Sequence, residues 1–146
     1  MTAAAENDAA PDPLMERITG AADGLYIISE TDSPLTPFCW QNFFAEGGSR
    51  DVDKLLRSQQ KLPEETLVEI RTLEQFFKVQ IEPAEGDDEE IIEEKRRLAE
   101  LRDLLEKELQ ETAVYRTGEI KIMAYVLGRI PGTNDAAGVS AELVET

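Results

Sequence analysis

The sequence predicts an α/β (α+β) domain with a largely antiparallel sheet. Segments with apolar residues at helical spacing alternate along the chain with short segments of strand-forming residues. The last two predicted strands have no helix between them, which favours an antiparallel pair. The chain has 146 residues, of which 41% are hydrophobic, and this suits one core. We assign residues 13–146 to a single domain. Residues 1–12, mostly alanine with acidic and polar residues, are expected to form a flexible N-terminal tail.

The first part of the chain predicts a helix, a strand and a polar loop. Pro13 suits the first turn of a helix, and Gly24 suits its end. Residues 25–28 are apolar and rich in strand formers, so they indicate a strand. Residues 29–34 are polar and include turn-forming residues, which indicates a loop directly after that strand.

The middle of the chain predicts a second strand at residues 37–44. Cys39, the one cysteine of the chain, lies in an apolar run within it and is expected to be a buried thiol. Residues 51–60 predict a short helix. Residues 66–77 are ambiguous, because their first half suits a strand and their second half suits a helical turn. Residues 87–110 carry apolar side chains along one helical stripe and predict a long helix.

The last part of the chain predicts two strands joined by a long loop. Residues 118–127 alternate at first and become apolar on both faces toward their end, which is typical of a sheet covered by helices on both sides. Residues 128–138 contain turn-forming pairs and predict the connecting loop. Residues 139–144 alternate again, so the sheet is expected to hold the chain up to its last residues.

The composition excludes several classes of function. Thirty-one acidic residues against fifteen basic ones give a net charge of −16. Such a surface repels nucleic acid and anionic membranes and attracts a basic partner, for example the phosphate-binding cleft of a nuclease. Solubility or a salt-loving source is the alternative explanation of the acidity. The chain has no histidine, which excludes histidine-based acid–base chemistry, the usual nucleophile triads and the usual zinc sites.

The sequence also predicts no activity or cofactor of the chain's own. No glycine-rich phosphate-binding motif is present, and paired carboxylates carry little weight in so acidic a chain. No segment approaches the ~20 apolar residues of a membrane span. The first residues do not resemble a signal peptide. We therefore expect a cytoplasmic protein that is not an enzyme, that needs no cofactor, and that binds neither nucleic acid nor membrane directly.

Two places are candidates for a binding site. Glu30 lies in the polar loop after the first strand, where the alternative is a solvated turn residue. Glu145 and Thr146 bring together a side-chain carboxylate, a hydroxyl and a main-chain carboxylate, where the alternative is an ordinary frayed end. Mg²⁺ accepts only a few protein oxygens and keeps several waters. Such a terminus is therefore suited to capping a metal ion already seated in the active site of another protein.

The same two places carry a resemblance to a known family. Residues 22–30, followed by Pro34, resemble the front motif of the nuclease A inhibitor family. The last third resembles that family as well, at residues 114–119, 125–128, 137–140 and 144–146. Between residues 44 and 112 the resemblance is looser and rests on the order of the elements.

The resemblance implies a three-layer α-β-α sandwich similar to the plant pathogenesis-related class 1 fold. It also implies tight binding to a Mg²⁺-dependent, sugar-non-specific endonuclease of the ββα-metal type, which cleaves DNA and RNA. In this family the C-terminal threonine, here Thr146, reaches the catalytic Mg²⁺ of the nuclease. A glutamate of the front motif, here Glu30, approaches the same metal through water. With the adjacent Glu145, these residues are expected to bind the partner and to form no metal site of their own.

One departure from the family pattern concerns the partner. The family has an aromatic residue in the acidic loop before the long helix, whereas residues 84–90 contain none. Binding energy at protein interfaces concentrates in buried aromatic residues. The sequence therefore does not determine which nuclease is the target or how tightly it is bound. The alternative function is an acidic protein-interaction module of the same fold that binds a basic partner other than a nuclease. An enzyme with a carboxylate-bound metal is a third possibility, which would require an all-oxygen site.

Overall fold

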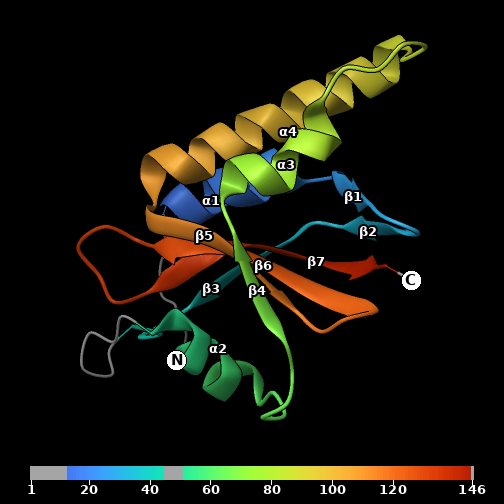
Figure 1. The fold of residues 1–146 in the computed structure, drawn as a ribbon. Helices are drawn as coiled ribbons and strands as arrows, with labels where there is room; N and C mark the ends of the chain where they lie inside the picture. Colours follow the sequence, from blue (N-terminus) through green and yellow to red (C-terminus); the bar gives the residue numbers. More distant parts are fainter. Residues whose placement is uncertain (1–12, 45–50, 146) are drawn as a thin grey trace.

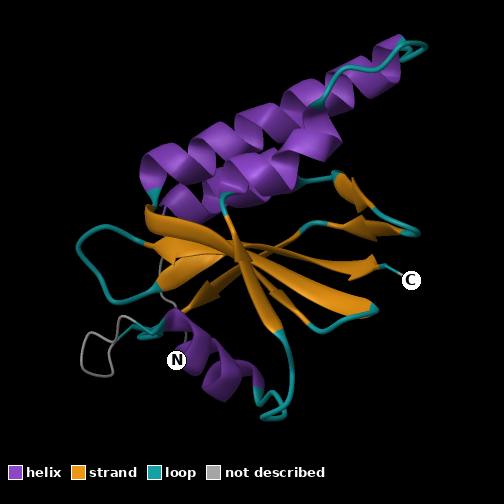
Figure 2. Ribbon diagram, in the orientation of Figure 1, coloured by secondary structure: helices purple, strands orange, loops and turns teal. Residues whose placement is uncertain are grey.

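The computed structural model describes residues 13–44 and 51–145, and its elements form three layers (Figures 1 and 2). Helices α1 (Pro13–Ala22), α3 (Leu73–Ile81) and α4 (Glu89–Glu108) cover one face of a sheet, and α2 (Val52–Gln60) lies on the other side. The strands are β1 (Tyr26–Ile28), β2 (Asp32–Pro34), β3 (Thr36–Trp40), β4 (Val68–Arg71), β5 (Gln110–Thr117), β6 (Lys121–Arg129) and β7 (Ala136–Val144).

The strands form two antiparallel sheets. The larger sheet has five strands in the order β3-β7-β6-β5-β4, and β1 pairs with β2 in a separate hairpin. The prediction of an α+β fold with a largely antiparallel sheet is thus confirmed. The similarity to the plant pathogenesis-related class 1 fold stays a prediction. The predicted tail, residues 1–12, lies outside the described residues.

Each face of the large sheet has its own apolar core, because successive side chains of a strand point to opposite faces. In β6, Ile122, Ala124 and Val126 belong to the core under α1, α3 and α4, whereas Tyr125 and Leu127 belong to a second core on the side of α2. The other buried members of the second core are Phe43, Phe44, Leu56, Tyr115 and Ala136. The prediction that this strand is covered on both faces is confirmed.

Strand β5 is the element that the sequence does not predict. It follows α4 directly, and its residue Glu111 has a φ of 54° where the pairing of β5 with β6 shifts register. Its buried half also contains a charged residue, Arg116. The bulge and the arginine interrupt the alternating pattern. For this reason the sequence predicts the next strand only at residue 118, where the structure has a turn before β6.

Other element boundaries differ from the prediction for local reasons. The chain leaves β3 at Trp40 instead of residue 44, because Asn42 adopts a φ of 57° in a turn. Thr72 caps α3, and its hydroxyl and the Gln75 side chain each accept a backbone N–H, so this helix runs on to Ile81. The polar loop after β1 contains the short strand β2, and the last strand begins at Ala136 instead of residue 139.

Cys39 is exposed, so the prediction of a buried thiol is wrong. Strand β3 is an edge strand of the large sheet. Phe38 and Trp40 stack on each other with ring centroids 4.3 Å apart and pack against the second core. Cys39, between them in the strand, points to the opposite face. At the edge of a sheet an apolar run therefore buries only alternate residues.

Strands β6 and β7 approach each other so closely at Gly138 that no side chain fits between them. A Cβ atom at this position would lie 1.7 Å from the carbonyl oxygen of Val126, which is a backbone atom and cannot rotate away. Gly138 therefore determines the spacing of the two central strands.

Replacement of Gly138 by alanine is expected to lower the free energy of unfolding by about 3 kcal/mol, because β6 and β7 must separate locally. Gly20→Ala is the control: Gly20 lies in α1 with open space around its Cβ position, so alanine should stabilise the protein by about 0.5–1 kcal/mol. Urea denaturation followed by circular dichroism measures both changes. An unchanged midpoint for Gly138→Ala would contradict this account of the strand spacing.

Candidate functional site

The structure brings two of the predicted site residues to one place. Glu30 follows β1 and Glu145 follows β7, and both line a cavity of about 400 Å³ between these strands, α3 and β5. Both residues are exposed. Thr146, the third predicted residue, lies outside the described residues.

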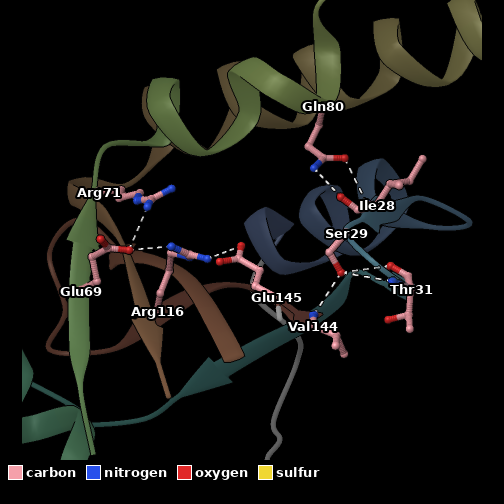
Figure 3. A network of polar contacts seen from close by, with 9 residues as sticks. All are labelled: Ile28, Ser29, Thr31, Glu69, Arg71, Gln80, Arg116, Val144 and Glu145. Atoms are coloured by element: carbon pink, nitrogen blue, oxygen red, sulfur yellow. Dashed lines mark hydrogen bonds and ion pairs between the residues drawn. The ribbon is translucent and has the colours of Figure 1, made fainter. Parts of the chain in front are cut away.

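The loop that carries Glu30 is attached to the end of β7. The Glu30 backbone N–H donates to the carbonyl oxygen of Val144 at 3.2 Å. The Val144 N–H donates to the Ser29 hydroxyl oxygen at 3.1 Å, and that hydroxyl also donates to the carbonyl oxygen of Thr31 (Figure 3). The Ser29 hydroxyl therefore accepts a backbone N–H at the end of β7 and stabilises the turn around Glu30 at the same time.

Helix α3 holds the same loop from the other side through Gln80. Its side-chain oxygen accepts the backbone N–H of Ile28 at 3.0 Å, and its side-chain nitrogen donates to the Ile28 carbonyl oxygen at 2.9 Å (Figure 3). The amide thus imitates a neighbouring strand for one residue of β1. Sequence reasoning did not find Gln80, because a half-buried glutamine near the end of an amphipathic helix gives no distinct signal.

The position of Glu145 depends on Arg116, whose side chain is only 6% exposed. The guanidinium of Arg116 lies between Glu69 of β4 and Glu145, and it donates to both carboxylates (Figure 3). Arg71 pairs with Glu69 at 2.9 Å from the exposed side. The Glu145 backbone N–H donates to the carbonyl oxygen of Ile120 at 2.9 Å. Glu145 is therefore fixed through both its main chain and its side chain.

These ion pairs shift the pKa values of Arg116 and Glu69. Burial disfavours the charged form of Arg116, but hydrogen bonds to Glu145 and Glu69 outweigh it, so the pKa of Arg116 is raised. The hydrogen bond from Arg116 lowers the pKa of Glu69, despite some desolvation, and Arg71 contributes further. Arg116 lies within one of the blocks that resemble the inhibitor family, yet the sequence assigned it no role. The feature that could have identified Arg116 is a charged residue in the buried half of a strand.

The arrangement is suited to binding. Within residues 13–44 and 51–145, no group of three or more acidic, cysteine or histidine side chains is placed to hold a metal ion. No helix in that part of the chain is long and apolar enough to cross a membrane. The site presents carboxylates on a fixed frame at the edge of the sheet.

A protein-family model described as nuclease A inhibitor-like protein matches residues 12–146. The chain belongs to the nuclease A inhibitor-like family. The match confirms the family that the front and back motifs indicated, and it extends through the middle of the chain, where the resemblance is loose. Among curated proteins, no sequence matches the chain. Membership of this family implies a nuclease inhibitor, and a nuclease as its partner.

Removal of the Arg116 charge is expected to weaken the fold in a pH-dependent way. Arg116→Met should lower the free energy of unfolding at neutral pH by about 1.5–3 kcal/mol, because Glu69 and Glu145 lose their charged hydrogen bonds. The contribution of Glu69 is complete above its ordinary pKa of 4.5 and is lost as the pH falls through its lowered value in the folded state. The difference between the two proteins should therefore narrow from about pH 6 to about pH 3.

Chemical denaturation across that pH range measures the effect, with Arg17→Met as the control. Arg17 is 54% exposed and pairs with Glu108 at 3.4 Å, so its loss should cost only about 0–1 kcal/mol. A wild-type advantage over Arg116→Met that stayed constant down to acid pH would show that the Glu69 pair is not its source.

Proposed function

We propose that the chain inhibits a Mg²⁺-dependent, sugar-non-specific endonuclease of the ββα-metal type by covering its active site with Glu30, Glu145 and Thr146. The observation that carries this proposal is that Glu30 and Glu145, from opposite ends of the sequence, line one cavity and are held by hydrogen bonds. Thr146 follows Glu145 directly in the sequence. The site is a binding surface, and the chain acts as an inhibitor and not as an enzyme.

The mechanism is competition with the substrate at the nuclease metal. The net charge of −16 draws the inhibitor toward a basic substrate cleft. A carboxylate or hydroxyl of Thr146 then takes the place of an oxygen of the scissile phosphate at Mg²⁺, and Glu30 approaches the metal through a bound water. Because Ser29 already holds the main chain of this edge at Val144 and Arg116 holds the side chain of Glu145, little conformational freedom is lost on binding.

A C-terminal extension is the first test of this mechanism. Two residues added after Thr146 move the terminal carboxylate away from the metal, so inhibition of a purified ββα-metal nuclease should weaken by at least ~100-fold. The same two residues added before Met1 are the control and should leave inhibition unchanged. The inhibition constant from a nucleic-acid cleavage assay is the measurement. Full potency of the C-terminally extended protein would refute the assigned role of Thr146.

The Glu30→Gln substitution tests the second carboxylate. It removes the charge and keeps the shape, so binding to the nuclease should weaken by about 2–5 kcal/mol with little change in stability, since the side chain is exposed. Glu106→Gln is the control. It makes the same change near the end of α4, which lies on the opposite side of the molecule from the C-terminus (Figure 1). Equal losses for both variants would mean that only the overall charge matters.

The alternative of an acidic interaction module with a basic non-nuclease partner gives a different result. Such a protein leaves the cleavage rate of purified ββα-metal nucleases unchanged at concentrations well above that of the enzyme. The same cleavage assay therefore separates the two functions.

A further inference from the structure

Two large aliphatic side chains stand exposed at the candidate site. Val79 of α3 is 76% exposed and Ile28 of β1 is 62% exposed. Single exposed apolar residues are ordinary, but these two border the same cavity that Glu30 and Glu145 line. Apolar side chains also lie deeper in this cavity. They include Ile27, Phe76 and Leu143, each less than a tenth exposed.

The part of this cavity between Ile28 of β1 and Val79 of α3 is called the groove below, and its two walls are fixed in relation to each other. Gln80 lies next to Val79 in α3 and bonds both the N–H and the carbonyl oxygen of Ile28. The two elements that carry Ile28 and Val79 therefore cannot separate without breaking the pair of hydrogen bonds between Gln80 and Ile28 (Figure 3). A preformed groove does not have to be ordered when a partner binds.

We propose that this groove is a second contact of the inhibitory surface and accepts one apolar side chain of the nuclease, beside the carboxylates that face its metal. The proposal rests on the proposed function and adds to it the apolar part of the interface. A volume of about 400 Å³ is large enough for one large apolar side chain. Interfaces typically place such an apolar anchor in a pocket near their centre and surround it with polar contacts.

The charge around the groove selects this occupant over a second copy of the chain. Glu30 and Glu145 lie on its border together with Arg71 and Arg116, and the whole molecule has a net charge of −16, so two copies that met at this face would repel each other. A partner with a basic cleft has the complementary charge. An apolar residue beside that cleft would enter the groove as the carboxylates approach the metal.

The introduction of a negative charge at Val79 separates an apolar contact from attraction by charge alone. Val79→Asp adds a negative charge to a surface that already attracts a basic partner. If charge alone drives binding, inhibition should strengthen or stay the same; if an apolar side chain fills the groove, inhibition should weaken by at least ~10-fold. Leu67→Asp is the matched control, since Leu67 is 56% exposed, precedes β4 and does not line the cavity.

The measurements are the inhibition constant against the same purified ββα-metal nuclease and the thermal unfolding of each variant. Weaker inhibition by Val79→Asp and by Val79→Ala, with Leu67→Asp unaffected and folding retained, supports the groove. Unchanged or stronger inhibition by both Val79 variants overturns it, while a loss with Glu30→Gln in the same assay leaves the proposed function intact. A wild-type chain that inhibits no such nuclease overturns both proposals.

Discussion

The close approach of β6 and β7 at Gly138 is the constraint on which the candidate site depends. With a glycine at this point the two strands keep one register from Lys121 opposite Val144 to Arg129 opposite Ala136. The register brings the end of β7 beside the turn after β5, where the Glu145 N–H reaches Ile120. A shift by one residue would turn every side chain of β7 to the other face and remove Val144 from Ser29.

The two cores make this central pair of strands rigid. Alternate residues of β6 pack under the three helices of one layer and against α2 and its aromatic neighbours in the other. A strand buried on both faces cannot tilt toward either layer without opening a cavity. The hairpin of β1 and β2 is not part of the large sheet, and side chains add to the backbone hydrogen bond from Glu30 to Val144 in attaching it. Ser29, Ser33 and Gln80 each bond backbone groups across this gap.

The main helices and the central strands could be predicted from the sequence because their periodicity is regular. The α+β class and the double covering of β6 follow from that pattern alone. Strand β5 could not be predicted, because a bulge breaks its alternating pattern. The exposure of Cys39 could not be predicted either, because it depends on the position of β3 at the edge of the sheet. Which strand lies at an edge is a property of the whole sheet.

The site was predictable only in part, for a related physical reason. Glu30 and the end of the chain were found from a local motif and from a resemblance. The residues that position them, Arg116 and Gln80, act across the fold on partners far away in sequence. Long-range polar contacts of this kind leave no periodic trace. They become recognisable when a charged or amide side chain, such as the buried Arg116 or the half-buried Gln80, is seen with its polar groups hydrogen-bonded.

The acidic loop between α3 and α4 shows why the binding energy must come from elsewhere. Asp87 accepts the Ala84 N–H at 2.9 Å and pairs with Lys95 at 2.7 Å, and the Lys95 hydrogen bond lowers the pKa of Asp87. Asp88 caps α4 through the Ile91 N–H. These two carboxylates thus stabilise the connection between the helices. The loop has no aromatic residue to bury in a partner.

Charge sets the rate at which such an acidic surface meets a basic partner, but it acts only over a Debye length of about 8 Å at physiological salt and distinguishes basic surfaces poorly. Partner choice therefore depends on features of fixed shape. At the candidate site these are the ordered edge with Glu30 and Glu145 and the apolar groove beside it, whose walls Gln80 joins. Under the proposed function, the groove supplies the apolar contact that the acidic loop, which has no aromatic residue, does not offer.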